Sequence, residues 1–189
     1  MPTSGVPRPP RPEVAGGIHH VYSRGAKKAT IFVTDEDRQL YLASLAKVVR
    51  FTSWNVLAYC LMGNHMHLLI ETPKPNLGQG MQRLHGPYAR KFNLRHAGSG
   101  HVYGARFKSK LIHSDMQFWA TANYIAQNPV EAGLCRAPEA WPWSSHAQIV
   151  AGRAPAWLAT NRLFSFFDSF GGDPRERYLE YVASATALP

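Results

Sequence analysis

Two histidines, His65 and His67, are separated by one residue in a segment whose composition predicts a strand over residues 65–72. Alternate residues of a strand leave the same face, so both imidazoles point the same way, with Cα atoms about 6.6 Å apart. The apolar residues that alternate with them face the opposite side, toward a core. Two imidazoles at this spacing can bind one divalent ion, although an isolated His-x-His pair is a weak signal. The pair is therefore a candidate metal site.

A tyrosine, Tyr124, lies on a helix that is predicted from Ser114 to about Asn128, where Ser114 and Gln117 form a capping-box start. At about 100° per residue, Tyr124 falls on a polar flank of this helix, beside its buried stripe. The pattern is typical of an amphipathic tyrosine whose ring packs while its hydroxyl meets solvent. Helix periodicity alone therefore gives Tyr124 no catalytic role.

Asn128 has two interpretations. It opens the run Asn128-Pro129-Val130-Glu131, which places Asn at a helix cap, Pro at the first position and Glu three residues after the cap. As a cap, its side-chain oxygen accepts from backbone N–H groups, and Pro129 disfavours helical geometry at Asn128. The same amide oxygen is equally suited to a metal ion. From these residues alone, cap and ligand both stay open.

Positive charge is concentrated in one part of the chain. The 189 residues include 21 Lys and Arg against 12 Asp and Glu, and no carboxylate lies between Glu71 and Asp115. Such a stretch favours a polyanionic partner, and the aromatic residues interleaved with it suit single-stranded nucleic acid, whose phosphates meet cations and whose bases stack on rings. A solvated basic surface is the alternative. The residues predicted to contact DNA are Arg83, Arg90, Lys91, Arg95, Arg106, Phe107, Lys108 and Lys110.

Composition predicts one globular domain, because 45% of the residues are hydrophobic and 12% are aromatic. No apolar run approaches the roughly 18 residues of a membrane span, and the Pro-rich N-terminus lacks the apolar centre of a signal peptide. We therefore expect a cytoplasmic protein with no membrane partner. Cys60 and Cys135 form no CxxC pattern and are interpreted as reduced packing residues.

The elements expected to position these residues follow one order. They are a strand over 17–23, a helix from 35, strands over 54–61 and 65–72, a helix over 76–96, a strand or hairpin over 102–113, and the helix over 114–128. Locally paired strands with helices between them predict an α+β fold, a ferredoxin-like sandwich with a mainly antiparallel central sheet and helices packed on it.

Three segments together resemble the single-tyrosine HUH transposases, and most closely the REP-associated tyrosine transposases of the IS200-like type. They are Leu57–Glu71, which contains Gly-Asn-His-Met-His, then Tyr124–Leu134, and Trp141-Pro-Trp-Ser-Ser145. The chain departs from the family at Gly63, Ala126 and Glu131, where proline, histidine and arginine are usual. The resemblance covers about residues 13–150. It implies an HUH catalytic domain over 16–150. The Pro-rich composition of residues 1–15 predicts a flexible arm before this domain, and helix-like patterns predict a helical C-terminal tail over 151–189, outside the resemblance.

The resemblance also implies roles for the residues above. His65 and His67 become the HUH metal pair, Tyr124 the nucleophile, and Asn128 the third ligand, with Mg²⁺ or Mn²⁺ as the cofactor. The implied activity is that of a metal-dependent endonuclease and strand transferase on single-stranded or hairpin DNA. It proceeds through a 5′-phosphotyrosine and a free 3′-OH, without a nucleotide cofactor.

Two alternatives stay open at this point. One is a non-cleaving hairpin-binding protein derived from a transposase, and the other is a small replication initiator or relaxase. The sequence does not fix the oligomeric state.

Overall fold

The computed structural model describes residues 13–186, so most of the expected arm lies outside the described residues. The strands and α-helices are β1 (Gly17–Arg24), α1 (Asp35–Thr52), β2 (Asn55–Leu61), β3 (His65–Thr72), α2 (Leu77–Arg95), β4 (Lys108–Ile112), α3 (Asp115–Glu131), α4 (Ser145–Val150), α5 (Thr160–Ser165) and α6 (Pro174–Thr186). Single 3-10 turns occupy η1 (Ala26–Lys28), η2 (Pro138–Ala140) and η3 (Asp168–Phe170). Within residues 13–186, none of the helices combines the length and apolar character needed to cross a membrane.

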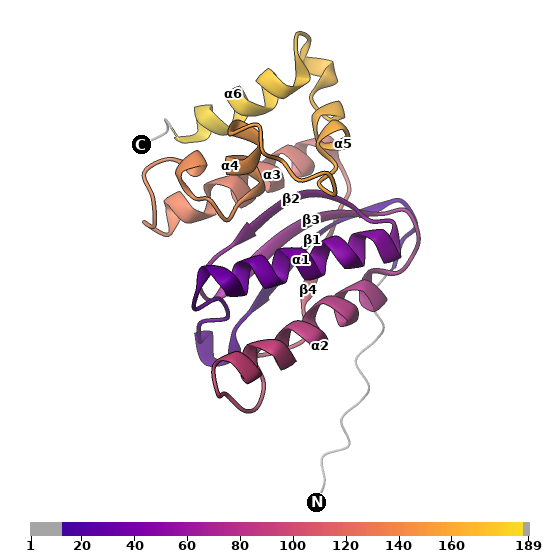
Figure 1. Ribbon diagram of the computed structural model, residues 1–189. Coiled ribbons are helices and arrows are strands. Elements are labelled where there is room, and N and C mark those ends of the chain that lie inside the picture. The colour runs from indigo at the N-terminus through magenta and orange to yellow at the C-terminus, as the bar shows by residue number, and fades with distance from the viewer. Residues whose placement is uncertain (1–12, 187–189) are drawn as a thin grey trace, which may run out of the picture.

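The four strands form one sheet in the order β2-β3-β1-β4, and every neighbouring pair is antiparallel. Helices α1 and α2 lie on one face of this sheet, whereas α3 to α6 gather on its other side, next to β2 (Figure 1). The expected ferredoxin-like sandwich is therefore confirmed. The expected strand over 102–113 is shorter in the structure, since only Lys108–Ile112 pairs with β1.

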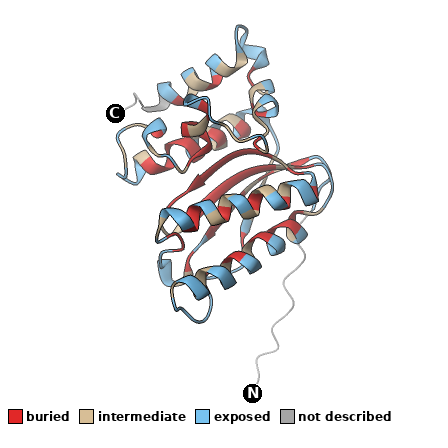
Figure 2. Ribbon diagram, in the orientation of Figure 1, coloured by how far each residue is buried: buried red, intermediate tan, exposed pale blue. Residues whose placement is uncertain are grey.

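The core lies mainly between the sheet and the helices α1 and α2, whose sheet-facing sides are buried (Figure 2). Helix α1 begins with a capping box between Thr34 and Asp37. The buried Asp37 carboxylate also pairs with Arg95, at 3.2 Å, and with His96, at 2.9 Å. One carboxylate thus ties the start of α1 to the end of α2.

A close contact between α2 and the segment before β2 gives a test of this packing. A Cβ atom added at Gly80 would lie 2.0 Å from Cζ2 of Trp54, whose indole N–H donates to Asn76 at 2.8 Å and is thereby held in place. We expect Gly80→Ala to lower the free energy of unfolding by about 1–3 kcal/mol through overpacking, measured by urea denaturation.

The matched control is Gly63→Ala. Nothing lies within 4 Å of a Cβ at Gly63, and its φ is not positive. This change is expected to be neutral or to stabilise the protein by up to about 1 kcal/mol. Equal stability of the two variants would contradict the packing described here.

The motif Trp141-Pro-Trp-Ser-Ser145 fastens the chain after α3 to strand β2. The indole N–H of Trp141 donates to the Leu61 carbonyl at 3.1 Å. The backbone N–H of Tyr59 donates to the Ser145 hydroxyl at 2.9 Å. This motif therefore supports the sheet that carries the two histidines.

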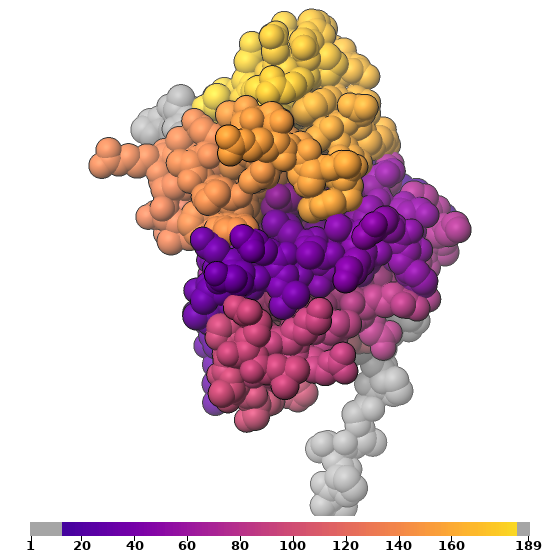
Figure 3. Space-filling model, in the orientation of Figure 1, coloured from indigo at the N-terminus to yellow at the C-terminus, as the bar shows by residue number. Residues whose placement is uncertain are grey.

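The described part of the tail, residues 151–186, packs behind α3. The rings of Phe118 and Phe166 stack with centroids 3.8 Å apart, and the Trp119 N–H donates to the Phe166 carbonyl at 2.8 Å. Near the other end of α3, the Gln127 amide donates to the Val182 carbonyl at 2.8 Å. In the space-filling view the orange and yellow atoms of the C-terminal elements lie directly against the indigo and purple atoms of the N-terminal half (Figure 3).

The part of the expected helical tail from residue 157 to residue 170 is not one helix in the structure. It resolves into α5 and the turn η3, with the chain bending at Phe166 and Phe167. The bend lets Phe166 stack on α3 while Phe167 is fully buried against Tyr178 of α6.

Candidate active site

A cavity of about 800 Å³ opens between strands β1, β3 and β4 and helix α3. Its walls contain His65 and His67 from β3 and Tyr124 from α3, so the structure brings the histidine pair and the tyrosine to one place. The rings of His67 and Tyr124 meet edge to face with centroids 5.3 Å apart. His67 is only 5% exposed, whereas Tyr124 is 39% exposed. A buried imidazole therefore lies beside a phenol that solvent and substrate can reach.

The alternation expected for β3 places the two histidines as predicted. Their side chains share one face of the sheet, with ring centroids 5.1 Å apart and ring planes perpendicular. Met66 and Leu68, which alternate with them, are fully buried. The same strand thus anchors the site through its apolar residues and presents both imidazoles.

The orientation of His65 is set by two asparagines. Its Nδ1 donates to the side-chain oxygen of Asn64 at 2.7 Å, and the Asn64 amide N–H₂ in turn donates to the Lys28 carbonyl. With its hydrogen on Nδ1, neutral His65 has a lone pair on Nε2. That Nε2 lies 3.1 Å from Oδ1 of Asn128, which is also an acceptor. Two acceptor atoms that face each other, Nε2 of His65 and Oδ1 of Asn128, cannot form a hydrogen bond together. Both can instead bind a cation placed between them.

Asn128 lies inside α3 and is not a helix cap. The helix continues through Pro129 to Glu131, and the Asn128 carbonyl accepts from the backbone N–H of Ala132 at 3.0 Å. The cap interpretation is therefore wrong. Pro129 has no N–H group to donate to the Ile125 carbonyl, so the helix lacks one backbone hydrogen bond there. The hydrogen bond from Gln127 to the tail stabilises this turn. As a result the Asn128 side chain is left to face His65.

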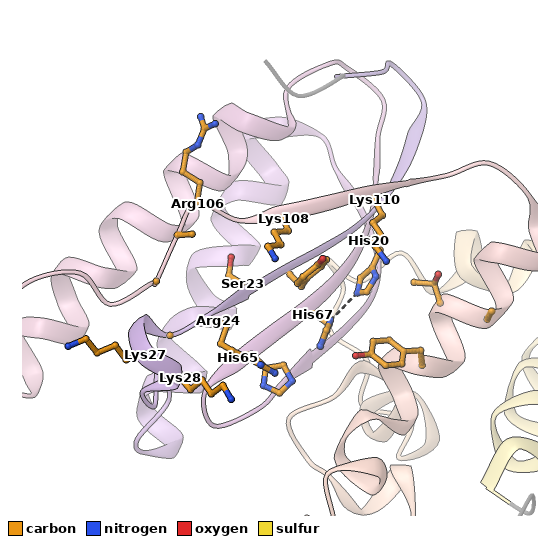
Figure 4. A pocket seen from close by; sticks show the side chains of 17 residues that line it. His20, Ser23, Arg24, Lys27, Lys28, His65, His67, Arg106, Lys108 and Lys110 are labelled. Carbon is orange, nitrogen blue, oxygen red and sulfur yellow. Dashed lines mark hydrogen bonds between the residues drawn. The ribbon is translucent and has the colours of Figure 1, made fainter. Parts of the chain in front are cut away.

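His67 has one occupied ring nitrogen and one unpartnered one. Its Nδ1 lies 2.9 Å from Nε2 of His20, a strand β1 residue that the sequence did not single out, and Figure 4 shows this contact. Its Nε2 is buried and has no hydrogen-bond partner. A buried, unsatisfied nitrogen is costly in a folded protein, which points to a ligand at this position.

Burial keeps these imidazoles uncharged. Burial and the neighbouring imidazoles lower the pKa of His67 to about 3, and burial with nearby Lys110 lowers the pKa of His20 to about 4. Burial also lowers the pKa of His65, and Arg24 acts in the same direction. At neutral pH the two Nε2 lone pairs are thus free to bind a cation.

These residues fit a divalent metal ion. The donor set would be Nε2 of His65, Nε2 of His67 and Oδ1 of Asn128, two imidazoles and one amide oxygen. No three His, Cys, Asp or Glu side chains group into a metal site anywhere in residues 13–186. A site here therefore depends on the amide oxygen and leaves coordination positions for substrate oxygens.

Six cations surround the same cavity, and none of its lining residues is acidic. Three were predicted from the sequence, namely Arg106, Lys108 and Lys110. Three more come from the end of β1 and the turn that follows it, namely Arg24, Lys27 and Lys28 (Figure 4). Sequence reasoning missed this second group because only the pairing of β1 with β3 brings the turn next to His65. The signal that could have found this group is the pair Lys27 and Lys28, which follows the first strand in the sequence.

The other predicted DNA contacts lie elsewhere. Arg83, Arg90, Lys91 and Arg95 are on α2, across the sheet from the cavity. The Arg83 guanidinium lies 3.8 Å from the Phe51 ring centre, and Arg95 pairs with Asp37. Phe107 is buried, in the loop that leads into β4. The structure does not bring these five residues to the site, and their contact with DNA stays a prediction.

A comparison with models of protein families shows which family the chain belongs to. The model described as "Transposase IS200 like" matches residues 15–128, well over half of the chain. The chain belongs to the IS200-like transposase family. The matched region ends at the residue whose amide faces His65, so it contains both histidines, the tyrosine and Asn128.

One solved structure shows the same fold. This transposase is similar to a REP-associated tyrosine transposase bound to a REP hairpin, with a TM-score of 0.64 and 19% identity over 80% of this chain and 90% of that one. A putative transposase from Deinococcus radiodurans R1 aligns with a TM-score of 0.44 and 15% identity, over 66% of this chain and 96% of that one. No curated protein matches the chain.

Proposed function

We propose that this IS200-like transposase cuts and rejoins single-stranded or hairpin DNA through a covalent bond to Tyr124, with a divalent metal ion as cofactor. One observation carries the proposal. A reachable tyrosine and two imidazoles line one cavity together with six cations and no carboxylate. Nε2 of His67 is buried there without a partner, and the Asn128 amide oxygen lies 3.1 Å from Nε2 of His65. The REP hairpin bound by the similar transposase supports the choice of substrate.

Tyr124 is the proposed nucleophile. Its phenolic oxygen attacks the scissile phosphorus, the bond to the 3′ oxygen breaks, and the products are a 5′-phosphotyrosine and a free 3′-OH. The phenol proton passes to solvent, and the leaving 3′ oxygen takes up a proton. A divalent ion held by His65, His67 and Asn128 would polarise the phosphate and offset its developing charge. Attack of a 3′-OH on the phosphotyrosine rejoins DNA, so no nucleotide is consumed.

The cations hold the DNA backbone in this scheme. Arg24, Lys27 and Lys28 lie on one side of the cavity, and Lys108 and Lys110 line strand β4 on another (Figure 4). A DNA strand that crosses the cavity between these two groups of cations would pass the rings of His67 and Tyr124. Phosphate contacts of this kind supply affinity and register but little sequence information.

The direct test uses labelled oligonucleotides, each a hairpin with single-stranded flanks, incubated with the protein and Mg²⁺ or Mn²⁺. On a denaturing gel we expect a shortened 3′-OH fragment and a protein-linked 5′ fragment, both dependent on the metal. Tight binding without cleavage across many hairpins and both metals would contradict the proposal and favour a hairpin-binding protein.

The salt dependence of DNA binding tests the role of the cavity cations that lie in β4 or just before it. Replacing Arg106, Lys108 and Lys110 together by Ala should reduce the slope of log K against log salt by about 2, because each single-strand phosphate contact contributes about 0.7. Affinity at fixed, moderate salt should fall substantially. Fluorescence anisotropy with a labelled hairpin, at four or more salt concentrations, measures both quantities.

The matched control removes the same number of charges from α2, as Arg83→Ala, Arg90→Ala and Lys91→Ala together. These side chains are exposed on the other side of the sheet. If DNA is held only in the cavity, the slope should stay within error of the parent value, whereas the DNA contacts that the sequence predicts for α2 would reduce it. An equal loss of slope in both triple variants would show that net charge, and not the cavity, sets the affinity.

A further inference from the structure

His20 occupies a position that the proposed reaction leaves unexplained. Its ring lies between those of Tyr22, His67 and Tyr124, with centroid distances of 5.3, 5.1 and 5.9 Å. Its Nε2 lies 2.9 Å from Nδ1 of His67, on the side of that ring away from the unpartnered Nε2. His20 thus contacts Nδ1 of the His67 ring, while Nε2 of the same ring faces the candidate metal position.

The contact determines which nitrogen of His67 is available. A neutral imidazole carries its hydrogen on one ring nitrogen and a lone pair on the other. If Nδ1 of His67 donates to His20, the lone pair must lie on Nε2, and His20 must carry its own hydrogen on Nδ1. The reverse arrangement would place a hydrogen on the buried Nε2 of His67, where no acceptor exists. The first arrangement avoids this buried hydrogen without an acceptor and leaves the Nε2 lone pair of His67 ready to bind.

His65 is oriented in the same manner by a different residue. Its Nδ1 donates to Asn64, and its Nε2 is the nitrogen that faces Asn128. Nδ1 of each histidine of the pair therefore has an acceptor. It is Asn64, from the turn before β3, for His65, and His20, from β1, for His67. Such outer partners fix the ring and the tautomer of metal-binding histidines, and their loss usually weakens metal binding by about 10–100-fold.

We propose that His20 is a positioning residue for the metal centre: it accepts the Nδ1 hydrogen of His67 and holds the Nε2 lone pair of that ring toward the ion. This inference rests on the proposed metal site. His20 contacts neither DNA nor the ion in this scheme and acts only through His67.

Two substitutions separate this role from simple packing. His20→Phe keeps an aromatic ring among Tyr22, His67 and Tyr124 but removes the acceptor. His20→Gln keeps an acceptor at a similar reach but removes the ring. A positioning role predicts that Mn²⁺ affinity falls about 10–100-fold in His20→Phe and stays within about threefold of the parent in His20→Gln. A packing role predicts the opposite order.

The readout is Mn²⁺ binding to the DNA-free protein, which is measured from the electron paramagnetic resonance signal of the free ion. The melting temperature of each metal-free variant is the folding control. In the cleavage assay, His20→Phe should need correspondingly more Mn²⁺ for half-maximal rate, and saturating Mn²⁺ should restore most of the maximal rate. Parent-like Mn²⁺ affinity in a folded His20→Phe protein would overturn the inference.

The failure of the metal site itself would look different. If the parent protein binds no Mn²⁺, or if His65→Ala and His67→Ala bind it as the parent does, the proposed metal centre is wrong and the role of His20 falls with it. If those two variants lose Mn²⁺ but His20→Phe does not, only the inference about His20 is wrong.

Discussion

Tyr124→Phe should abolish the covalent protein–DNA product and lower the cleavage rate by at least about 10³-fold, since no other group is proposed to take the phosphate. Only the phenolic oxygen is removed, and the ring can keep its edge contact with His67. DNA affinity should therefore stay within about threefold of the parent value, because phosphate contacts supply it. Denaturing gels and fluorescence anisotropy on the same hairpin measure the two effects separately.

A suitable control for this change is Tyr181→Phe. Tyr181 is a half-buried tyrosine of α6 whose ring contacts Phe167, outside the cavity. This variant loses the same hydroxyl and should cleave like the parent. A persistent covalent product in Tyr124→Phe would identify another nucleophile and end the proposal as stated.

His67→Ala should lower metal-dependent cleavage by about 10³-fold or more, with hairpin affinity largely kept. The variant removes the imidazole whose Nε2 is buried without a partner, and it leaves His65 and Asn128 as an incomplete donor set. Raising Mn²⁺ should restore little activity. The rate is measured against metal concentration, and the melting temperature reports whether the fold survives the change.

The control for the loss of an imidazole is His113→Ala. His113 is exposed just after β4 and does not line the cavity. Its removal should leave the metal dependence of cleavage unchanged. Full activity of His67→Ala at ordinary Mn²⁺ concentrations would be incompatible with a role in metal binding.

Much of the fold follows from local patterns. Alternation in β3 predicted which face carries His65 and His67, and the order of strands and helices predicted the sheet that the structure shows. Both predictions rest on patterns within short segments, although the strand pairs of the sheet join residues that are distant in the chain. The role of Tyr124 was different, because helix periodicity gave it only a polar flank and the family resemblance supplied the link to the histidines.

The missed residues depend on contacts that no local pattern contains. His20 and the cations Arg24, Lys27 and Lys28 reach the cavity through the pairing of β1 with β3, about 40 residues away in the chain. The cap interpretation of Asn128 failed for a similar reason. Pro129 is a local signal to end a helix, but packing of the tail on α3 overrides it.

The anchoring of α3 by the C-terminal tail affects how the protein is made. During translation the residues up to Asn128 emerge from the ribosome well before Phe166 and Val182, which pack behind the tyrosine helix. Until then the outer side of α3 lacks these contacts, and the turn around Pro129 lacks the hydrogen bond from Gln127 to Val182. A nascent chain can therefore form its sheet early, while the pairing of phenol and imidazoles awaits the synthesis of α5 and α6.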